Sequence, residues 1–346
     1  MKPGIRSKLA AIVLGLIAAL PWTWAVAQTP AKQLFGGKDL PVVAKPQVFG
    51  SYARGCLAGG MALPVNGPTW QAMRLERNRR WGHPDMIALV ERLSREAVAD
   101  GWPGLLVGDI SQPRGGPMLS GHASHQLGID ADIWLTPMPA RTLTQAERRD
   151  MSAISMLKGD TLYVDPNRWT AAHGRLIARA ASYPQVQRIF VHPGIKKKLC
   201  ETYGANSAND GWLNKVRPIY GHHYHFHIRM RCPAGSPGCK PQESTGRGNQ
   251  CGDELAWWFT DEPWRPKKKD PNAKPPRQVT LADLPKACAV VLDGPAPASI
   301  DEVTYGLGGA PGAAAPSIAA AAPVAASAGQ SAFLPETGPL PGERPW

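Results

Sequence analysis

Apolar residues follow helical spacing in some segments of this chain and strand-like alternation in others, so the pattern predicts both kinds of element. Four segments repeat their apolar residues every three or four positions, and we expect them to be helices. They are residues 84–100, 143–157, 170–182 and 193–200. Short apolar or alternating runs predict strands. These are residues 105–110, 187–191 and the second halves of 120–135 and 216–230. No internal repeat is visible, so nothing indicates a repeat architecture.

The segment 120–135, SGHASHQLGIDADIWL, combines a strand-like half with side chains that bind metals well. Its apolar residues alternate and share one face of the expected strand: Ile129, Ala131 and Ile133. Asp130 and Asp132 share the other face, because successive strand side chains point to opposite sides. His122 and His125 precede them in the same segment. Burying two carboxylates in an apolar run is costly unless a positive charge faces them, so the segment predicts a metal site.

A second histidine-rich segment, 216–230, ends in the strand-like sequence YHFHIRM. His225 and His227 are two positions apart and share a strand face, while the apolar residues between and after them point toward a core. Together with His125 and Asp132, this segment completes a mixed nitrogen and oxygen ligand set that suits zinc. Three protein ligands and a water indicate a catalytic zinc site, in which zinc lowers the pKa of the water to about 7.

Other arrangements compete with this metal site. The chain has no His-Glu dipeptide, which excludes the HExxH zinc arrangement on a helix. A serine mechanism through Ser120 or Ser124 stays open, although no G-x-S-x-G elbow surrounds either residue. A single histidine is more often an ordinary core or surface residue than a ligand. Here histidines and aspartates gather in two short strand-like segments, which favours a metal.

The first 27 residues have the three parts of a secretory signal peptide. Three cations form its basic start: Lys2, Arg6 and Lys8. Residues 9–20 form an apolar run too short to span a membrane, and Ala25-Val26-Ala27 is the cleavage pattern. Cleavage before Gln28 would release an exported protein without a lipid-anchoring cysteine. We then expect an extended segment over 28–50, a folded domain over 51–305 and a low-complexity, disordered tail over 306–346.

Cysteine number and charge agree with export. The six cysteines all follow the signal peptide, and an even count in an exported chain favours three disulfides. A structural zinc site would need close pairs such as C-x₂-C, and the closest pair is Cys232 and Cys239. The formal net charge is +12 at pH 7. For an exported protein this charge favours an anionic polymer such as the cell wall, rather than nucleic acid, as the partner.

Four segments together resemble the penicillin-insensitive murein endopeptidases. They are SGHASHQLGIDADIWL, RIFVHPGIKKKLC, KVRPIYGHHYHFHIRM and CGDELAWWF. That family is part of the LAS group of zinc peptidases, with the lysostaphin-type and D-Ala-D-Ala peptidases and the hedgehog signalling domain. The resemblance covers about residues 50–291. It implies an α+β fold in which a central, mainly antiparallel sheet carries the zinc ligands and helices pack outside it.

The resemblance also assigns roles to individual residues. The zinc ligands would be His125, Asp132 and His227. His122 would be a further ligand or an orienting neighbour. His222 and His225 would be catalytic, as general base or as stabiliser of the tetrahedral oxyanion. Asp130 would accept a hydrogen bond from a ligating imidazole. The glutamate base of the D-Ala-D-Ala peptidases has no counterpart here, so histidine would supply the general base.

The implied function is that of a zinc metallo-endopeptidase in the periplasm. It would hydrolyse the D-alanyl–meso-diaminopimelyl cross-link of peptidoglycan with a zinc-activated water. No acyl-serine would form, so β-lactams would not block the enzyme. Two alternatives remain: a zinc-containing wall-binding protein without activity, and a basic polyanion-binding protein whose histidines hold a structural metal. The family also leaves a homodimer as an open alternative.

By similarity, three disulfide pairs are expected: Cys56–Cys288, Cys200–Cys251 and Cys232–Cys239. Arg217, Arg229 or the arginines within residues 74–80 would hold substrate carboxylates. Candidates for a second metal site are Asp160, Asp165 and His173.

Overall fold

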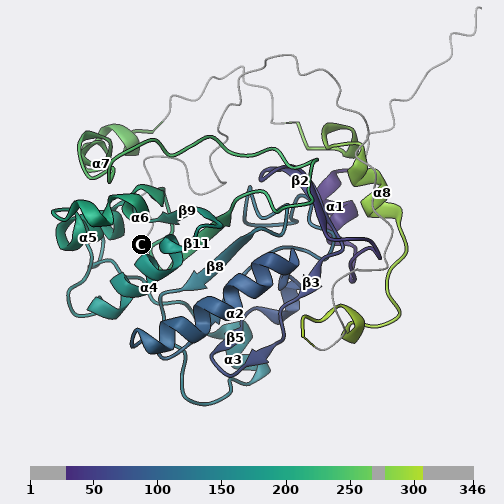
Figure 1. Ribbon diagram of the computed structural model, residues 1–346, viewed down its shortest axis with the longest axis horizontal. Coiled ribbons are helices and arrows are strands. Elements are labelled where there is room, and N and C mark those ends of the chain that lie inside the picture. Colours follow the sequence, from purple (N-terminus) through teal and green to yellow (C-terminus); the bar gives the residue numbers. More distant parts are fainter. Residues whose placement is uncertain (1–28, 267–276, 307–346) are drawn as a thin grey trace, which may run out of the picture.

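The computed structural model describes residues 29–266 and 277–306. Its main sheet has seven strands in the order β10-β9-β11-β8-β7-β5-β4 (Figure 1). In chain order they are β4 (Asn66–Gly67), β5 (Trp70–Ala72), β7 (Leu105–Val107), β8 (Asp130–Trp134), β9 (Val186–Val191), β10 (Val216–Pro218) and β11 (His225–Met230). The pairs β9–β11, β11–β8, β8–β7 and β5–β4 are antiparallel, and β10–β9 and β5–β7 are parallel. The expected mainly antiparallel sheet is confirmed.

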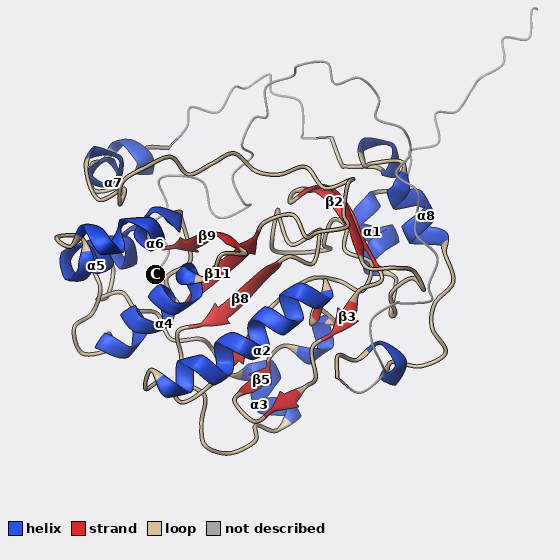
Figure 2. Cartoon of the chain, viewed as in Figure 1, coloured by secondary structure: helices blue, strands red, loops and turns tan. Residues whose placement is uncertain are grey.

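Helices cover one face of this sheet, as Figure 2 shows. α2 (Pro84–Ala99) and α4 (Ala171–Ser182) bury their apolar sides there, in one core with the apolar side chains of β8, β9 and β11. α2 begins where predicted because Pro84 takes the first helical turn and His83 Nδ1 accepts a hydrogen bond from the Asp85 amide. α5 (Pro193–Tyr203) and α6 (Asp210–Lys215) pack against β9 and β10. This face therefore supplies stability, and the opposite face is left for polar groups.

A smaller layer lies beside the main sheet. β1 (Gln47–Ser51) and β2 (Arg54–Ala58) form an antiparallel pair. α1 (Ala31–Gly36) and α8 (Ala287–Asp293) bury Phe35 and Val291 in a separate core with this pair. The short strands β3 (Met61–Ala62) and β6 (Trp81–Gly82) also pair, and α3 (Gln145–Asp150) and α7 (Asp253–Trp257) are the remaining α-helices of the described residues.

All three expected disulfides are present: Cys56–Cys288, Cys200–Cys251 and Cys232–Cys239. The first joins β2 to α8 across a sequence separation of 232 residues. It therefore fastens the last described helix to the N-terminal strand pair. The zinc alternative for the cysteines is wrong.

Two expected elements differ from the structure. The helix predicted over 143–157 ends at Asp150, because the next amides bond outside it: Ile154 N donates to Thr136 Oγ1 and Met156 N to His223 O. The segment 28–50 was expected to be extended, yet α1 forms inside it because Phe35 is fully buried against α8 and its neighbours.

The predicted signal peptide and nearly all of the predicted tail lie outside the described residues. Within residues 29–266 and 277–306, none of the helices has the length and apolar character of a membrane span.

Candidate metal centre and active site

The register between β8 and β11 brings the two histidine-rich segments onto one face of the sheet. His227 lies opposite Asp132, and Arg229 lies opposite Asp130. The apolar side chains of both strands, such as Phe226 and Ile133, point into the core. The polar side chains that alternate with them therefore share the other face of the sheet. The local alternation seen in each segment thus becomes one continuous polar surface.

Three ligand atoms meet on this surface. His125 Nε2 lies 3.2 Å from His227 Nδ1, and Asp132 Oδ1 lies 3.4 Å from the first nitrogen and 3.5 Å from the second. Zinc bonds of about 2.0–2.1 Å at tetrahedral angles place ligand atoms about 3.3 Å apart. Asp132 Oδ1 is also buried without a hydrogen-bond donor among the described residues. These atoms therefore fit one zinc ion.

The protein holds the second ring nitrogen of both histidines. His125 Nδ1 donates to the Ile110 carbonyl at 2.8 Å. Because a carbonyl only accepts, the proton is on Nδ1 and the lone pair of Nε2 faces the centre. His227 Nε2 lies at ion-pair distance from Asp130 Oδ1, 3.1 Å away, and this carboxylate favours the proton on Nε2 and the lone pair on Nδ1.

The backbone before β8 adopts a conformation that brings His125 into place. His125 has φ 63°, a left-handed conformation that side chains with a Cβ adopt at a cost. Its amide donates to Asp130 Oδ2 at 3.0 Å, which stabilises this turn. Gly128 has φ 65°, and a Cβ there would lie 2.6 Å from Leu57 Cδ2. The glycine three residues after His125 is thus required by conformation and by packing.

Asp130 is a supporting carboxylate. Arg229 donates to it through Nε at 2.8 Å and through Nη2 at 3.3 Å. The Arg229 guanidinium lies between the rings of Tyr52 and Phe190, 4.2 and 4.8 Å from their centroids. Burial raises the pKa of Asp130, but Arg229 and His227 outweigh burial and hold that pKa well below its usual value. Asp130 is therefore ionised and fixed beside His227.

The pKa values of Asp132 and of the histidines around it are shifted in different directions. Burial raises the pKa of Asp132, but the imidazoles around it lower that pKa well below its ordinary value. Burial lowers the pKa of His125, yet Asp132 outweighs burial and raises it to about 9. For His227 burial prevails and lowers the pKa to about 4, and the pKa of His225 is also well below its usual value because of burial. The carboxylate of Asp132 thus interacts electrostatically with several imidazoles at once.

His122 lies at the edge of the same cluster. With His125 and Asp132 it forms a group whose ligand atoms all lie within 4.8 Å of one another. His122 Nε2 is 3.5 Å from Asp132 Oδ2 and 3.1 Å from Asp109 Oδ2. Burial raises the pKa of Asp109, but His122 and Arg79 lower it well below its usual range. Asp109 was not singled out from the sequence; its signal was an acid two residues after the apolar strand β7.

The two candidate catalytic histidines stand on the other side of Asp132. The ring centroids of His222 and His225 are 4.7 Å apart. His222 has φ 55°, and its Nδ1 donates to the Tyr220 carbonyl at 3.0 Å, so Nε2 is its basic nitrogen. His225 Nε2 lies 3.6 Å from Asp132 Oδ1. Both are buried, and together they give the site two imidazoles besides those of the ligand triangle.

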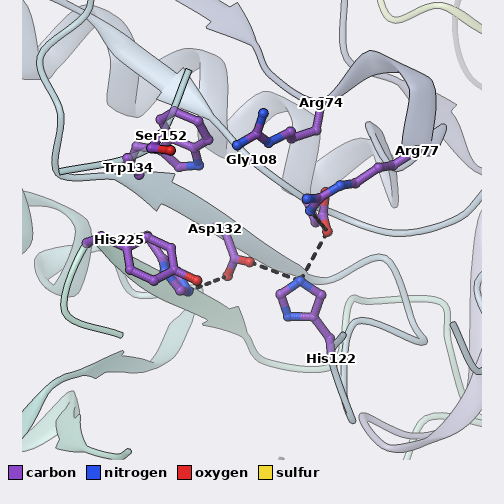
Figure 3. Close-up of a pocket in the computed structure, with 11 residues that line it drawn as sticks. Arg74, Arg77, Gly108, His122, Asp132, Trp134, Ser152 and His225 are labelled. Atoms are coloured by element: carbon purple, nitrogen blue, oxygen red, sulfur yellow. Dashed lines mark hydrogen bonds and ion pairs between the residues drawn. The ribbon is translucent and has the colours of Figure 1, made fainter. Parts of the chain in front are cut away.

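A pocket of about 280 Å³ opens onto this cluster. Figure 3 shows Asp132 between His225 on one side and His122 on the other, with Trp134 on the side of His225 and the two arginines, Arg74 and Arg77, on the side away from His225. The irregular segment after α3 contributes Ser152 to the rim. The pocket therefore joins the candidate metal centre to a positively charged wall.

The structure sorts the arginines that were expected to hold substrate carboxylates. Arg229 is buried and bound to Asp130, so it is wrong as a substrate contact. Arg217 pairs with Glu254 at 3.3 Å. Arg74 and Arg77, from the segment 74–80, line the pocket.

The other candidate sites are not assembled. His173 caps α4 at Thr170 and contacts the Leu135 carbonyl, and Asp165 pairs with Arg168. Among the described residues, the group of possible metal ligands formed by His122, His125 and Asp132 belongs to the cluster described above and includes none of Asp160, Asp165 and His173. Ser120 Oγ accepts a hydrogen bond from Arg79, so an arginine rather than an imidazole is its partner.

Comparison with known proteins decides the family. The family model described as penicillin-insensitive murein endopeptidase matches residues 48–293. The chain belongs to the penicillin-insensitive murein endopeptidase family. A Haemophilus influenzae protein named penicillin-insensitive murein endopeptidase is 42% identical over 282 residues, which cover 81% of this chain and 91% of that protein. Proteins of the same name from Yersinia enterocolitica and Pectobacterium atrosepticum are 39% and 38% identical, over 81% and 85% of this chain and 96% and 98% of their own. The resemblance of the four sequence segments to the murein endopeptidases is thus confirmed.

Proposed function

We propose that this protein is a zinc-dependent murein endopeptidase that hydrolyses the D-alanyl–meso-diaminopimelyl cross-link of peptidoglycan. The observation that carries the proposal is the triangle of His125 Nε2, His227 Nδ1 and Asp132 Oδ1, with sides of 3.2 to 3.5 Å. It stands beside a pocket of about 280 Å³ that Asp132, His122 and His225 line. Relatives named murein endopeptidases, similar over most of the chain, support the substrate class.

His125, Asp132 and His227 would hold the zinc ion, and His122 would orient Asp132 or add a further ligand. Bound there, zinc supplies Lewis acidity, which polarises a carbonyl and lowers the pKa of water to about 7. Asp130 keeps His227 in the correct tautomer and orientation, and the Ile110 carbonyl does the same for His125. The protein thus fixes both imidazoles before any substrate arrives.

His222 and His225 would perform the proton transfer and the charge stabilisation. One imidazole takes a proton through its ring nitrogen, and the other donates a hydrogen bond to the oxyanion of the scissile carbonyl. Their ring centroids are 4.7 Å apart, close enough for both to reach one reacting amide. No serine nucleophile takes part, so β-lactams, which acylate serine, would not inhibit the enzyme.

The cellular setting follows from the substrate. We propose export by the signal peptide of residues 1–27, with a periplasmic peptidase domain over 51–305. The segment 28–50 would precede this domain, and a tail over 306–346 would follow it. Cross-linked stem peptides are the proposed partner. A homodimer has no support among the described residues, and we do not propose it.

Purified protein incubated with cross-linked muropeptide dimers, with zinc and with a chelator, tests the proposal. We expect monomers with zinc and none with the chelator. If the zinc-loaded protein releases no monomers, the proposed peptidase activity is wrong, and the wall-binding alternative is favoured instead.

Two matched substitutions test the assignment of residues. His125→Ala should remove both bound zinc and cleavage. His225→Ala should remove cleavage while zinc, measured by atomic absorption, stays bound. Cleavage retained by His125→Ala would sink the ligand assignment.

A further inference from the structure

The wall of the pocket opposite His225 carries two guanidinium groups, those of Arg74 and Arg77 (Figure 3). We propose that they form a carboxylate subsite. It would bind the carboxylate next to the scissile amide, on the diaminopimelate that becomes the leaving amine. This inference rests on the proposed function and names the substrate group that the site selects.

Arg74 has donors available for a ligand. Its Nη2 donates to the Met151 carbonyl at 3.0 Å, and its guanidinium lies over the Trp134 ring, 5.5 Å from the centroid. Within residues 29–266 and 277–306, no carboxylate lies within ion-pair distance of it. The contacts with Met151 and Trp134 fix the plane of the guanidinium without neutralising its charge.

Among the described residues, Arg77 has one acidic partner, Asp109, which it shares with Arg79 and His122. Its Nη1 lies 3.3 Å from Asp109 Oδ2, which also binds Arg79 at 2.9 Å and His122 at 3.1 Å. The Arg77 side chain remains 45% exposed. One carboxylate thus faces two guanidinium groups and an imidazole, which leaves this wall with excess positive charge.

The loop that carries the two arginines is held in a strained conformation. Arg74 and Asn78, on either side of the short 3-10 helix Leu75–Arg77, have φ of 54° and 51°. Arg74 N donates to Arg148 O at 3.1 Å, and Arg77 N donates to Arg74 O at 3.0 Å. Left-handed residues cost stability and persist where the surroundings hold them. Here they place both side chains at the same opening.

The chemistry of the pocket selects the occupant. Arginine binds carboxylates through paired N–H donors in one plane. In the proposed cross-link, a carboxylate sits on the carbon that bears the scissile nitrogen, so it must lie close to the reacting amide. The same pocket holds Asp132 and His225 at one side and the arginines at the other. An amide bound between them would thus point this carboxylate at Arg74 and Arg77.

Two cross-linked muropeptide dimers test the subsite: one with this diaminopimelate carboxylate free, and one with it amidated. Zinc-loaded wild-type protein should cleave the amidated dimer with kcat/KM about 10- to 100-fold lower, since a charge-assisted contact is lost. Arg74→Gln and Arg77→Gln should lose as much on the free dimer and should discriminate between the dimers by less than about threefold.

The control is Arg141→Gln, because Arg141 pairs with Glu147 outside the pocket; it should behave as wild type. If wild type cleaves both dimers equally well, the subsite is wrong while the peptidase stands. If it cleaves neither, the proposed function falls, and calorimetric binding of both dimers to the same protein then decides the subsite. Equal Kd values overturn it, and tighter binding of the free acid supports it.

Discussion

Asp130 and Asp132 stand two residues apart on one face of β8, yet their surroundings differ in kind. Asp130 accepts two hydrogen bonds from Arg229 and one from the His125 amide. Asp132 faces four imidazoles, and its Oδ1 has no hydrogen-bond donor among the described residues. The first carboxylate faces a permanent guanidinium charge and is fully hydrogen-bonded, whereas the second faces only imidazoles and keeps one oxygen without a donor, as a metal ligand would.

The difference comes from what lies opposite each residue on β11. Arg229 faces Asp130 and brings a permanent charge with five donors. His227 faces Asp132 and brings a lone pair. The register of the neighbouring strand thus gives two identical side chains different surroundings, and we assign them the structural role and the ligand role proposed above on that basis.

The largest expected effect is that of Asp132→Asn. This isosteric change removes the negative charge that faces the four surrounding imidazoles, so zinc binding should be lost. Cleavage should fall by more than the roughly 10- to 100-fold typical of residues behind the ligands. Zinc content after dialysis and dimer cleavage measure both. A variant that keeps a full equivalent of zinc would remove Asp132 from the ligand set.

Asp130→Asn should act differently. His227 keeps a partner at its second nitrogen but a weaker one, so zinc affinity or activity should fall by about 10- to 100-fold. In zinc-free protein this variant should also unfold more easily, by about 3–5 kcal/mol, because Arg229 is left as an unpaired buried charge. Asp132→Asn in zinc-free protein supplies the comparison and should be destabilised less, because it leaves no permanent charge buried without a partner. Equal destabilisation by the two substitutions would contradict the difference that we infer between the two aspartates.

Arg229→Met approaches the same pair from the other side. It leaves Asp130 as the uncompensated charge, and urea unfolding should show a loss of about 3–5 kcal/mol. The double variant with Asp130→Asn should lose clearly less than the sum of the single changes, since the two residues act as one unit. Strict additivity would mean that the pair does not stabilise the site jointly.

Much of this arrangement could be predicted because it depends on the alternation of apolar and polar residues within each strand. The faces of Asp130 and Asp132 follow from residues 129–133, and the face of His225 and His227 from four residues of β11. The strand register does not. It places Arg229 opposite Asp130, so an arginine expected to meet substrate is instead buried in the support of His227.

Two other differences have the same origin in distant contacts. The helix expected over 143–157 stops early because Thr136 and His223, from other parts of the chain, take its next amides. Asp109 acquires its role only when residues 77–79 and His122 fold onto it. Pattern within a segment predicts which side chains share a face, but not which segment comes to lie across from them.

The smallest expected effect is that of removing the hydroxyl of Tyr52, whose ring packs against the Arg229 that binds Asp130. The Tyr52 ring lies 4.2 Å from the Arg229 guanidinium, and its hydroxyl donates to the Met230 carbonyl at 2.7 Å. Tyr52→Phe keeps the ring and removes the hydroxyl, so unfolding should cost about 1 kcal/mol less while zinc affinity stays within about twofold. Tyr52→Ala, which also removes the ring contact, should weaken zinc binding further. If Tyr52→Phe lowers zinc affinity as much as Asp130→Asn does, the Tyr52 hydroxyl contributes directly to the metal centre, and the support of Asp130 extends as far as Tyr52.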